Sequence, residues 1–423
     1  MTPAGNNLER ESTGMDADVI VVGCGVQGLS VARHLARRGL RVLAIDRVGP
    51  GRQTSARAAG QSVIAQTDPA MGALMHRSIE DITTFEERTG IPLPYHQVGS
   101  VKYARQEWSA EQLEREVERA SALGARVSMI SLAEAGLLAP HTNPSAAVAA
   151  WHAPDDIYFE PAIMADALYQ DAVAVGVEFR FDVEVTGFGV AGSVLQGVET
   201  SRGSFTADRV VLTTGSWTGP LLRETLGIEL PLAFVRHQYS IRGGAPKIHA
   251  GLPSVRIVED AVYARPVGTN LMFGTYEPRP LEFDLSELPE RTEQVPLDPA
   301  AVNQALANVA DIFPSVQDST VLEMRGGMVT MTPDGGYLID QVHEAEGLYF
   351  STGCNVMGLS VAPALGQDIA DWVINGHRPA SLAGFAVSRF SKSVPTDAEV
   401  HQKSLAEYEG IYRDSASRNF IRT

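Results

Sequence analysis

Three glycines near the N-terminus have the spacing of a nucleotide-binding turn. Gly23, Gly25 and Gly28 lie between an apolar run at 18–22 and a stretch with helical spacing at 28–38. In such a turn the first glycine permits a tight bend, the second lets a pyrophosphate approach the backbone, and the third lets helix and strand pack closely. The amides and dipole at the helix N-terminus favour the negative charge. The pattern predicts a site for the pyrophosphate of a dinucleotide.

Asp46 extends this interpretation to the ribose of the nucleotide. It ends a second apolar run at 41–46, which we expect to be the next strand. A carboxylate at this place can bind a ribose diol. The alternative is a coincidental glycine-rich turn, and the strand, helix and acid around the glycines make it the weaker interpretation. The turn by itself allows NAD or FAD.

The elements that position this turn form a discontinuous α/β arrangement. The unit of strand, turn, helix and strand at 18–46 predicts a parallel sheet. Alternating residues at 230–280 predict a mostly antiparallel sheet. The segment 347–376 returns to strand, glycine turn and helix, and we expect that helix to begin near Ala362. Because a simple nicotinamide dehydrogenase normally keeps its dinucleotide unit in one block, the pattern indicates another enzyme class.

Charge and composition exclude several kinds of partner. The 423 residues carry a net charge of -17, which disfavours nucleic acid and anionic membranes. Cys24 and Cys354 are neither a disulfide framework nor a metal-ligand set, so we expect no metal. The sequence has no apolar run of membrane-spanning length and no apolar signal core. We therefore expect a soluble, cytoplasmic protein.

Two later segments also lead from strands into glycine turns. They are "ADRVVLTTGSWTG" at 207–219, which would return the chain to the first turn, and "TPDGGYLIDQVHEAEGLYFSTGCNVMGLSVAP" at 332–363. With the first turn, and with "TSARAAGQ", "VRHQYSI" and "VYARPVGTNLMFGTYE", they resemble the D-amino-acid oxidase superfamily of FAD enzymes. The resemblance is closest to the group of sarcosine and dimethylglycine dehydrogenases and sarcosine oxidases. It implies FAD, rather than NAD, in the first turn.

The resemblance also implies a fold of two parts. A Rossmann-like FAD-binding domain would combine with a substrate domain, whose mixed, largely antiparallel sheet covers the flavin. The implied boundaries are 17–90, 155–220 and 325–385 for the discontinuous FAD-binding domain, 91–154 and 221–324 for the substrate domain, and 386–423 for a C-terminal tail.

Residues are assigned to FAD by the same resemblance, position by position. The first turn and the acid would hold the ADP half, and the loop at 54–61 would lie along the pyrophosphate and flavin. Val185 would meet the adenine, and the two later turns would contact FAD and the pyrimidine edge of its flavin. The positions are Gly23, Gly25, Val26, Gln27, Gly28, Asp46, Arg47, Ser55, Arg57, Ala58, Ala59, Gln61, Val185, Thr214, Gly215, Trp217, Gly353, Asn355, Val356, Met357, Gly358, Leu359 and Ser360.

The chain departs from the family at four places. Arg57 stands where the dehydrogenases attach FAD through a His, and the oxidases' Cys before "TPD" is missing, so we expect non-covalent FAD. Met272 matches the Lys that helps the oxidases activate oxygen, which favours another electron acceptor, although O2 and a carrier both stay open. The family's carboxylate-binding Arg and Lys are replaced by "SVIAQ" and Ser360, which argues against a glycine-like substrate.

Five side chains are candidates for the substrate side: His237, Tyr239, Tyr263, Arg265 and Tyr276. Strand alternation puts His237 and Tyr239 on one face. His237 is either a general base, as its type suggests near neutral pH, or a sheet histidine with only local hydrogen bonds. Arg265 either replaces the missing carboxylate ligands or is an ordinary surface or ion-paired arginine.

We therefore predict an FAD-dependent oxidoreductase with a small-molecule substrate. It would oxidise the C–N bond of a secondary or N-alkyl amine or amino acid by hydride transfer to flavin N5. One alternative is oxidation of a C–OH bond in a hydroxy acid or sugar-like alcohol, with His237 as the base. Another is the FAD subunit of a multi-chain complex, and a homo-oligomer or a partner subunit both stay open.

Overall fold

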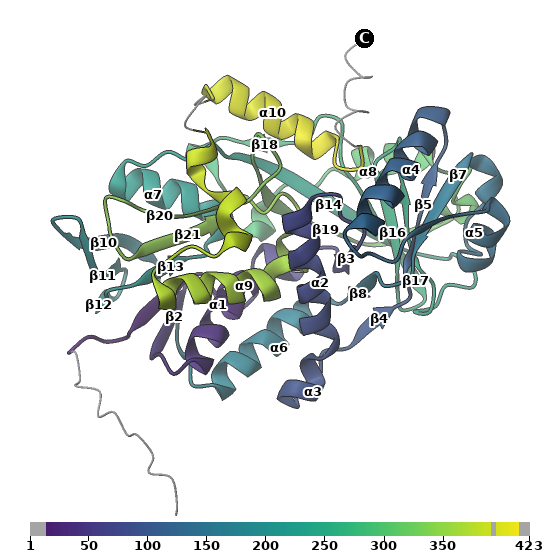
Figure 1. Ribbon diagram of the computed structural model, residues 1–423. Coiled ribbons are helices and arrows are strands. Elements are labelled where there is room, and N and C mark those ends of the chain that lie inside the picture. Colours follow the sequence, from purple (N-terminus) through teal and green to yellow (C-terminus); the bar gives the residue numbers. More distant parts are fainter. Residues whose placement is uncertain (1–13, 391–394, 414–423) are drawn as a thin grey trace, which may run out of the picture.

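The first of two large sheets carries the glycine turn. We describe the protein from a computed structural model that covers residues 14–390 and 395–413 (Figure 1). The sheet has six strands in the order β20-β21-β13-β1-β2-β9, and its pairs are parallel except β20–β21. The bounds are β1 (Val19–Val22), β2 (Val42–Asp46), β9 (Glu178–Phe181), β13 (Val210–Leu212), β20 (Leu338–Gln341) and β21 (Leu348–Thr352).

The order of these strands brings the three glycine-bearing segments together. β13 lies between β1 and β21, so the turns that follow these strands are neighbours at one edge of the sheet. Each residue of β1 is buried, as expected for a parallel strand covered on both faces. The prediction that the chain returns beside the first turn is confirmed.

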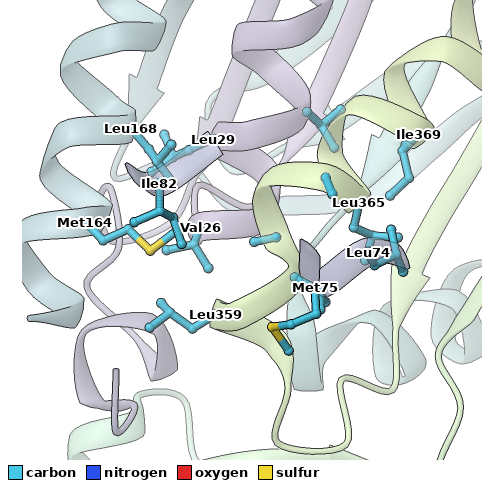
Figure 2. Packing of buried hydrophobic residues seen from close by; sticks show 14 of the residues in the cluster. Val26, Leu29, Leu74, Met75, Ile82, Met164, Leu168, Leu359, Leu365 and Ile369 are labelled. Atoms are coloured by element: carbon cyan, nitrogen blue, oxygen red, sulfur yellow. The ribbon is translucent and has the colours of Figure 1, made fainter. Parts of the chain in front are cut away.

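A layer of helices covers this sheet with a shared apolar core. The layer consists of α1 (Val26–Arg37), α2 (Pro69–Thr83), α3 (Phe85–Thr89), α6 (Pro161–Ala174) and α9 (Gly358–Asn375). Figure 2 shows the core between them, with Val26 and Leu29 of α1 among residues of α2, α6 and α9. A second core lies under α7 (Thr218–Leu226) and a small sheet of β10 (Val185–Ala191), β11 (Val194–Thr200) and β12 (Gly203–Thr206).

Helix α9 begins earlier than predicted. The prediction of a start near Ala362 placed Pro363 in the first turn, whereas the helix begins at Gly358 and contains Pro363. Proline removes one helical donor and disturbs the next hydrogen bond. Here Ser78 Oγ accepts the N–H of Ala364, and Ser30 Oγ donates to the Pro363 carbonyl. Serines of neighbouring helices thus bond the backbone next to the proline ring, a contact that local sequence does not show.

The second sheet is larger and mostly antiparallel, as predicted. Its path is β18-β14-β17-β16-β15-β5-β7-β6, with β19 paired to β14, and its pairs are antiparallel except β5–β15. The bounds are β5 (Ser100–Ala104), β6 (Ser128–Ile130), β7 (Ala149–Ala153), β14 (Ala233–Gly243), β15 (Ser254–Ile257), β16 (Val262–Val267), β17 (Asn270–Thr275), β18 (Glu282–Phe283) and β19 (Thr320–Met331).

Further elements complete the second half of the molecule (Figure 1). Helices α4 (Glu107–Ala122), α5 (Leu132–Leu138) and α8 (Pro299–Asn308) pack around the second sheet. A small sheet joins β3 (Gln61–Ser62), β4 (Tyr95–Gln97) and β8 (Ile157–Phe159). No helix within 14–390 and 395–413 is long and apolar enough to cross a bilayer.

The implied domain boundaries stay a prediction. One strand, β19, crosses the boundary implied at residue 325. β19 runs continuously through residue 325 and pairs with β14 along its length, so this strand does not divide at that boundary. The implied C-terminal tail contains a helix, α10 (Asp397–Glu409), whose N-terminus is capped by Thr396 and Glu399. Tyr408 of α10 is buried against Val235 of the second sheet. Residues 391–394 and 414–423 of this segment lie outside the described residues.

Register aligns five residues in a row on one face of the second sheet. Tyr239 lies opposite Gly274, Gly274 opposite Tyr263, Tyr263 opposite Arg256, and Arg256 beside Lys102. Directly opposite residues place their side chains on the same face of a sheet. We call these residues the central row.

Candidate active site

One large cavity connects the glycine turn with the central row. Its volume is about 1170 Å³, and it is lined by residues of both sheets. At one end lie the turn after β1 and the end of β2, and at the other lie His237, Tyr263 and Tyr276. The loop at 54–61 and the segment 354–360 line the cavity between these ends. The shape of the cavity suits a long ligand that starts at the glycine turn and a second, smaller ligand beside His237, Tyr263 and Tyr276.

The glycine turn has the close packing that the sequence predicts. A Cβ at Gly28 would overlap the carbonyl oxygen of Gly23, and a Cβ at Gly23 would overlap the backbone of Thr213 in the neighbouring segment. Gly23 also has a φ of +96°, which favours glycine. Gly25 provides no side-chain cap for α1, and although the Val26 N–H donates to Ser55 Oγ at 3.2 Å, the positive end of the helix dipole lies at the cavity and favours an anion.

Asp46 is held firmly at this turn. Its Oδ2 accepts the N–H of Cys24 at 2.7 Å, and its Oδ1 accepts those of Val48 and Gly49 at 2.8 Å each. A carboxylate oxygen can accept about two hydrogen bonds, so Oδ2 retains capacity for a ribose hydroxyl. Beside it the Arg47 guanidinium lies 4.4 Å from the centre of a Trp217 ring, forming a flat wall at the cavity.

The segment before α9 is held in a strained shape at the far side of the cavity. Asn355 and Val356 have φ values of +44° and +61°, and a β-branched residue in this region is an outlier. The Asn355 side chain holds the strain, because its Oδ1 accepts from Thr332 N at 2.9 Å and its Nδ2 donates to Gly353 O at 2.7 Å. The result is a helix N-terminus, with its positive dipole end, at the cavity.

Nearly all residues that the resemblance assigned to FAD line this cavity. Gly28 and Gly353 do not, because they support the two turns from behind. The fit of the cavity to FAD rests on three features: the closely packed glycine turn at the N-terminus of α1, the Asp46 carboxylate and the Arg47–Trp217 wall. These groups suit a pyrophosphate, a ribose and a flat ring, respectively.

His237 lies in a chain of hydrogen bonds between two tyrosines. Its Nδ1 is 2.9 Å from Tyr408 Oη, and its Nε2 is 3.0 Å from Tyr263 Oη. Tyr408 Oη donates to the carbonyl of Arg236 at 3.2 Å. Since that proton is used, we infer that Nδ1 donates to Tyr408, which leaves the Nε2 lone pair to accept the proton of Tyr263.

Burial among aromatic rings controls the ionisation of this chain. Tyr276 stacks on His237 with ring centres 4.8 Å apart, and Tyr412 meets Tyr276 edge-on at 5.3 Å. Desolvation lowers the pKa of His237 to about 4 and raises the pKa of Tyr263 well above its usual value. Both groups are therefore neutral near pH 7.

Two of the five substrate-side candidates lie outside the cavity lining. Tyr239 is buried in the central row and donates to the carbonyl of Ala58 at 3.3 Å. Arg265 is fully buried, donates to Ala59 O at 2.6 Å and pairs with Glu160 at 3.0 Å. Both side chains hold the loop at 54–61, so the ion-paired interpretation of Arg265 fits the structure and the carboxylate-ligand interpretation does not.

Sequence reasoning missed four residues that line the cavity or bond its histidine. Arg256 and Lys102 line the cavity from the central row, and Tyr412 lines it from the segment after α10. Tyr408 bonds His237 from α10 itself. A signal existed for Arg256, a lone charge within the apolar strand "SVRIV". Nothing local links the C-terminal tyrosines to this site.

Comparison with known proteins gives a family match over most of the chain. The family model described as "FAD dependent oxidoreductase", DAO, matches residues 18–372. The chain is 27% identical over 385 residues to 4-methylaminobutanoate oxidase (formaldehyde-forming) of Paenarthrobacter nicotinovorans, covering 88% of this chain and 45% of that protein. It is 26% identical to mitochondrial sarcosine dehydrogenase of Homo sapiens, covering 94% and 44%. The chain thus spans about half the length of the curated relatives it matches.

Solved structures share the fold over most of both chains. L-proline dehydrogenase from P. horikoshii superimposes with a TM-score of 0.80 at 22% identity, covering 89% of this chain and 98% of that one. Glycine oxidase from Geobacillus kaustophilus gives 0.77 at 24% identity, covering 88% and 98%. At these identities the likeness shows the fold alone.

Proposed function

The chain belongs to the DAO family of FAD-dependent oxidoreductases, and we propose that it oxidises the C–N bond of a secondary or N-alkyl amine or amino acid. The observation that carries the proposal is the single cavity, which joins the glycine turn to the Tyr263–His237 pair. The relatives named for methylaminobutanoate and sarcosine support an amine substrate. The cytoplasmic location stays a prediction.

In this proposal the bound FAD supplies the hydride acceptor at flavin N5. The glycine turn and Asp46 would hold the ADP half, and the loop at 54–61 and the segment 354–360 would hold the flavin. The residues expected to place the substrate are Tyr263, Tyr276 and His237.

The Tyr263–His237 pair is suited to bind the substrate amine in its uncharged form. An amine must be uncharged before its C–H bond can give up a hydride. Because Tyr263 gives its own proton to His237 Nε2, the Tyr263 oxygen presents its lone pairs to the cavity. The N–H of a neutral amine can therefore donate a hydrogen bond to Tyr263 Oη. Since burial disfavours a charged His237, the site binds the neutral amine more readily than the ammonium ion.

We propose that FAD is bound without a covalent bond. Arg57 lines the cavity where the dehydrogenases of the resembling group have their linking His. Denaturation in acid is expected to release the flavin into the supernatant. Flavin retained in the protein pellet would contradict this, and Cys354, which lines the cavity, would then be tested by Cys354→Ala.

We propose an electron acceptor other than O2. Met272, at the position of the oxidases' Lys, is 1% exposed, packs with Tyr239 and Tyr263 and carries no charge, while Arg265, opposite Met272 in the sheet, is ion-paired with Glu160. A positive charge there would stabilise developing superoxide. Turnover with a dye acceptor should therefore exceed turnover with oxygen, and equal rates would contradict the proposal.

Anaerobic reduction of the bound flavin tests the reaction class. The purified chain would be mixed with N-methyl and cyclic amines and, separately, with hydroxy acids and sugar alcohols, while the flavin absorbance is followed. Bleaching by amines alone is the expected result. Bleaching by hydroxy compounds alone would replace the proposal by C–OH oxidation, and no bleaching by either class would contradict both.

A further inference from the structure

Tyr412 forms part of the wall at the substrate end of the cavity, from the segment that follows α10. It lines the cavity together with Tyr263 and Tyr276, and it packs against the apolar cluster that contains Tyr263 and Met272. The match to the family model ends at residue 372, so α10 and Tyr412 lie beyond the matched residues. The role of Tyr412 therefore has to follow from its own contacts.

The Tyr412 ring is fixed by several neighbours. Tyr276 meets it edge-on with ring centres 5.3 Å apart. The Lys102 ammonium lies 5.4 Å from the centre of the ring, a distance that permits a cation–π interaction. The Tyr412 hydroxyl interacts with the side chains of Arg256 and Tyr276. Gln112 of α4 donates to the Tyr412 carbonyl at 2.5 Å, so the side chain and the backbone are both held in place.

The groups that fix the ring are themselves held by one carboxylate. Lys102 donates to both carboxylate oxygens of Glu116, at 2.8 and 2.9 Å. Gln112 and Trp151 donate to the same carboxylate, at 2.7 and 3.0 Å. Because a protein interior is close-packed, a ring with these supports yields little space to a larger ligand. Tyr412 is therefore a firm part of the wall.

We propose that Tyr412 sets the size limit for groups next to the substrate nitrogen. The inference rests on the proposed amine oxidation, in which the amine lies at the Tyr263 hydroxyl. Tyr263, Tyr276 and Tyr412 are neighbours at one end of the cavity, so a group attached to the nitrogen meets the Tyr412 ring. A methyl group fits beside this wall, whereas a phenyl ring needs the volume that the Tyr412 ring occupies.

Substrates that differ in the group on nitrogen test this assignment on the FAD-loaded protein. We would measure kcat/KM for 4-methylaminobutanoate and 4-benzylaminobutanoate, and for sarcosine and N-benzylglycine. The wild type should favour each methyl compound by roughly 100-fold, because a close-packed pocket rejects excess volume. Tyr412→Ala vacates the volume of the ring and should reduce this preference to about tenfold or less.

Two further variants separate the bulk of Tyr412 from its hydroxyl and from protein stability. Tyr412→Phe keeps the ring and should exclude the benzyl compounds as the wild type does. Tyr412→Leu removes part of the ring and should give an intermediate preference, so the test stands even where the Ala variant does not fold. The matched control is Tyr169→Ala, because Tyr169 of α6 packs against Phe179 and Phe181 and does not line the cavity. It should retain the wild-type preference.

Amines that cannot be oxidised give a readout that does not depend on the reaction. tert-Butylamine and 2-phenylpropan-2-amine have no hydrogen on the carbon next to nitrogen, and they differ by a methyl group against a phenyl group. Their binding would be followed by the change in absorbance of the oxidised flavin. The wild type should bind tert-butylamine more tightly, and Tyr412→Ala should gain roughly tenfold or more in affinity for the phenyl compound.

The outcomes separate this inference from the proposed function. Equal losses of kcat/KM for methyl and benzyl substrates in Tyr412→Ala would give Tyr412 a merely structural role and overturn the inference. So would a wild type that accepts both members of each pair equally well. If no amine reduced the flavin, the amine reaction would fail and the inert pair would decide the size limit. A gain in affinity for the phenyl compound in Tyr412→Ala but not in Tyr169→Ala would support the limit, and no gain would overturn it.

Discussion

At the scale of single residues, His237 shows how surroundings decide what a side chain can do. Its type suggests a base that titrates near neutral pH. The structure places both ring nitrogens on tyrosine hydroxyls and the ring against Tyr276, which lowers the pKa of His237 to about 4. The residue is thus a neutral acceptor for the Tyr263 proton across the physiological range.

This ionisation predicts the pH dependence of the reaction. We expect kcat/KM for an amine to show no inflection near pH 6.5, because His237 takes up a proton only near pH 4. The parameter should rise with pH along the ionisation of the substrate amine. His237→Leu removes the acceptor that orients the Tyr263 hydroxyl and should slow anaerobic flavin reduction by about 100-fold. An acid limb near pH 6.5 in the wild type would contradict this.

Gly274 offers a second test at this scale. It lies opposite Tyr263 in the central row, and a Cβ there would overlap the tyrosine ring and hydroxyl. Gly274→Ala should therefore displace the Tyr263 hydroxyl from His237 and lower the rate of flavin reduction by roughly tenfold or more, with FAD retained. Gly189→Ala in β10, where a Cβ makes ordinary contacts, is the matched control. An unchanged rate in Gly274→Ala would show that the Tyr263 position is not critical.

At the scale of elements, two helix starts and one helix end shape the cavity. α1 begins at the first glycine turn, and α9 begins at the strained Asn355–Val356 segment. α10 brings Tyr408 to His237, and the residues after it bring Tyr412 to the cavity. The capping box of Thr396 and Glu399 fixes where α10 starts and therefore which of its residues reach the sheet.

The close contact between α1 and β1 predicts the effect of a single methyl group. Gly28→Ala would drive a Cβ into the carbonyl oxygen of Gly23 and into Thr213, pushing the helix start away from the turn. We expect loss of most bound FAD, measured as the ratio of flavin to protein absorbance after purification. Gly72→Ala in α2, where a Cβ meets Leu123 at an ordinary 3.5 Å, should keep its FAD. A fully flavinated Gly28→Ala would contradict the predicted packing.

At the scale of the whole molecule, buried histidines link stability to pH. Burial lowers the pKa of His34 to about 2 and those of His141 and His237 to about 4. In the unfolded chain these groups take up protons near pH 6.5. The unfolded state therefore binds more protons than the folded state below that pH, and stability falls as the pH falls from 6.5 towards 4.

Asp156 has the opposite effect and offsets part of this loss. Burial raises the pKa of Asp156 to about 6, so the folded state takes up a proton that the unfolded state takes up only near 3.8. With three histidines against one aspartate, these groups should lower the free energy of unfolding by about 2–3 kcal/mol per pH unit near pH 5. Urea unfolding at pH 7, 6 and 5 measures this slope. His141→Gln, outside the cavity, should reduce it, and a free energy that is constant over this range would contradict the assignment.

The sequence alone determined the cofactor end of the molecule. Gly23, Gly25, Gly28 and Asp46 lie within one strand–turn–helix–strand unit, so their spacing can be recognised in the local sequence. The order of three such segments was enough to indicate FAD and the mixed fold.

Only the tertiary structure decided which side chains reach the substrate end of the cavity. Arg256 and Arg265 both lie on the face that carries Tyr263, so strand alternation treats them alike. The two arginines differ in their access to the cavity. The loop at 54–61 covers Arg265, while Arg256 lines the cavity next to Tyr412. The loop at 54–61 and the segment with Tyr412 are both distant in sequence from these arginines. Local propensity does not predict which residue a distant segment will bury. The glycine turn can be recognised from local spacing, whereas access of a side chain to the cavity depends on long-range packing.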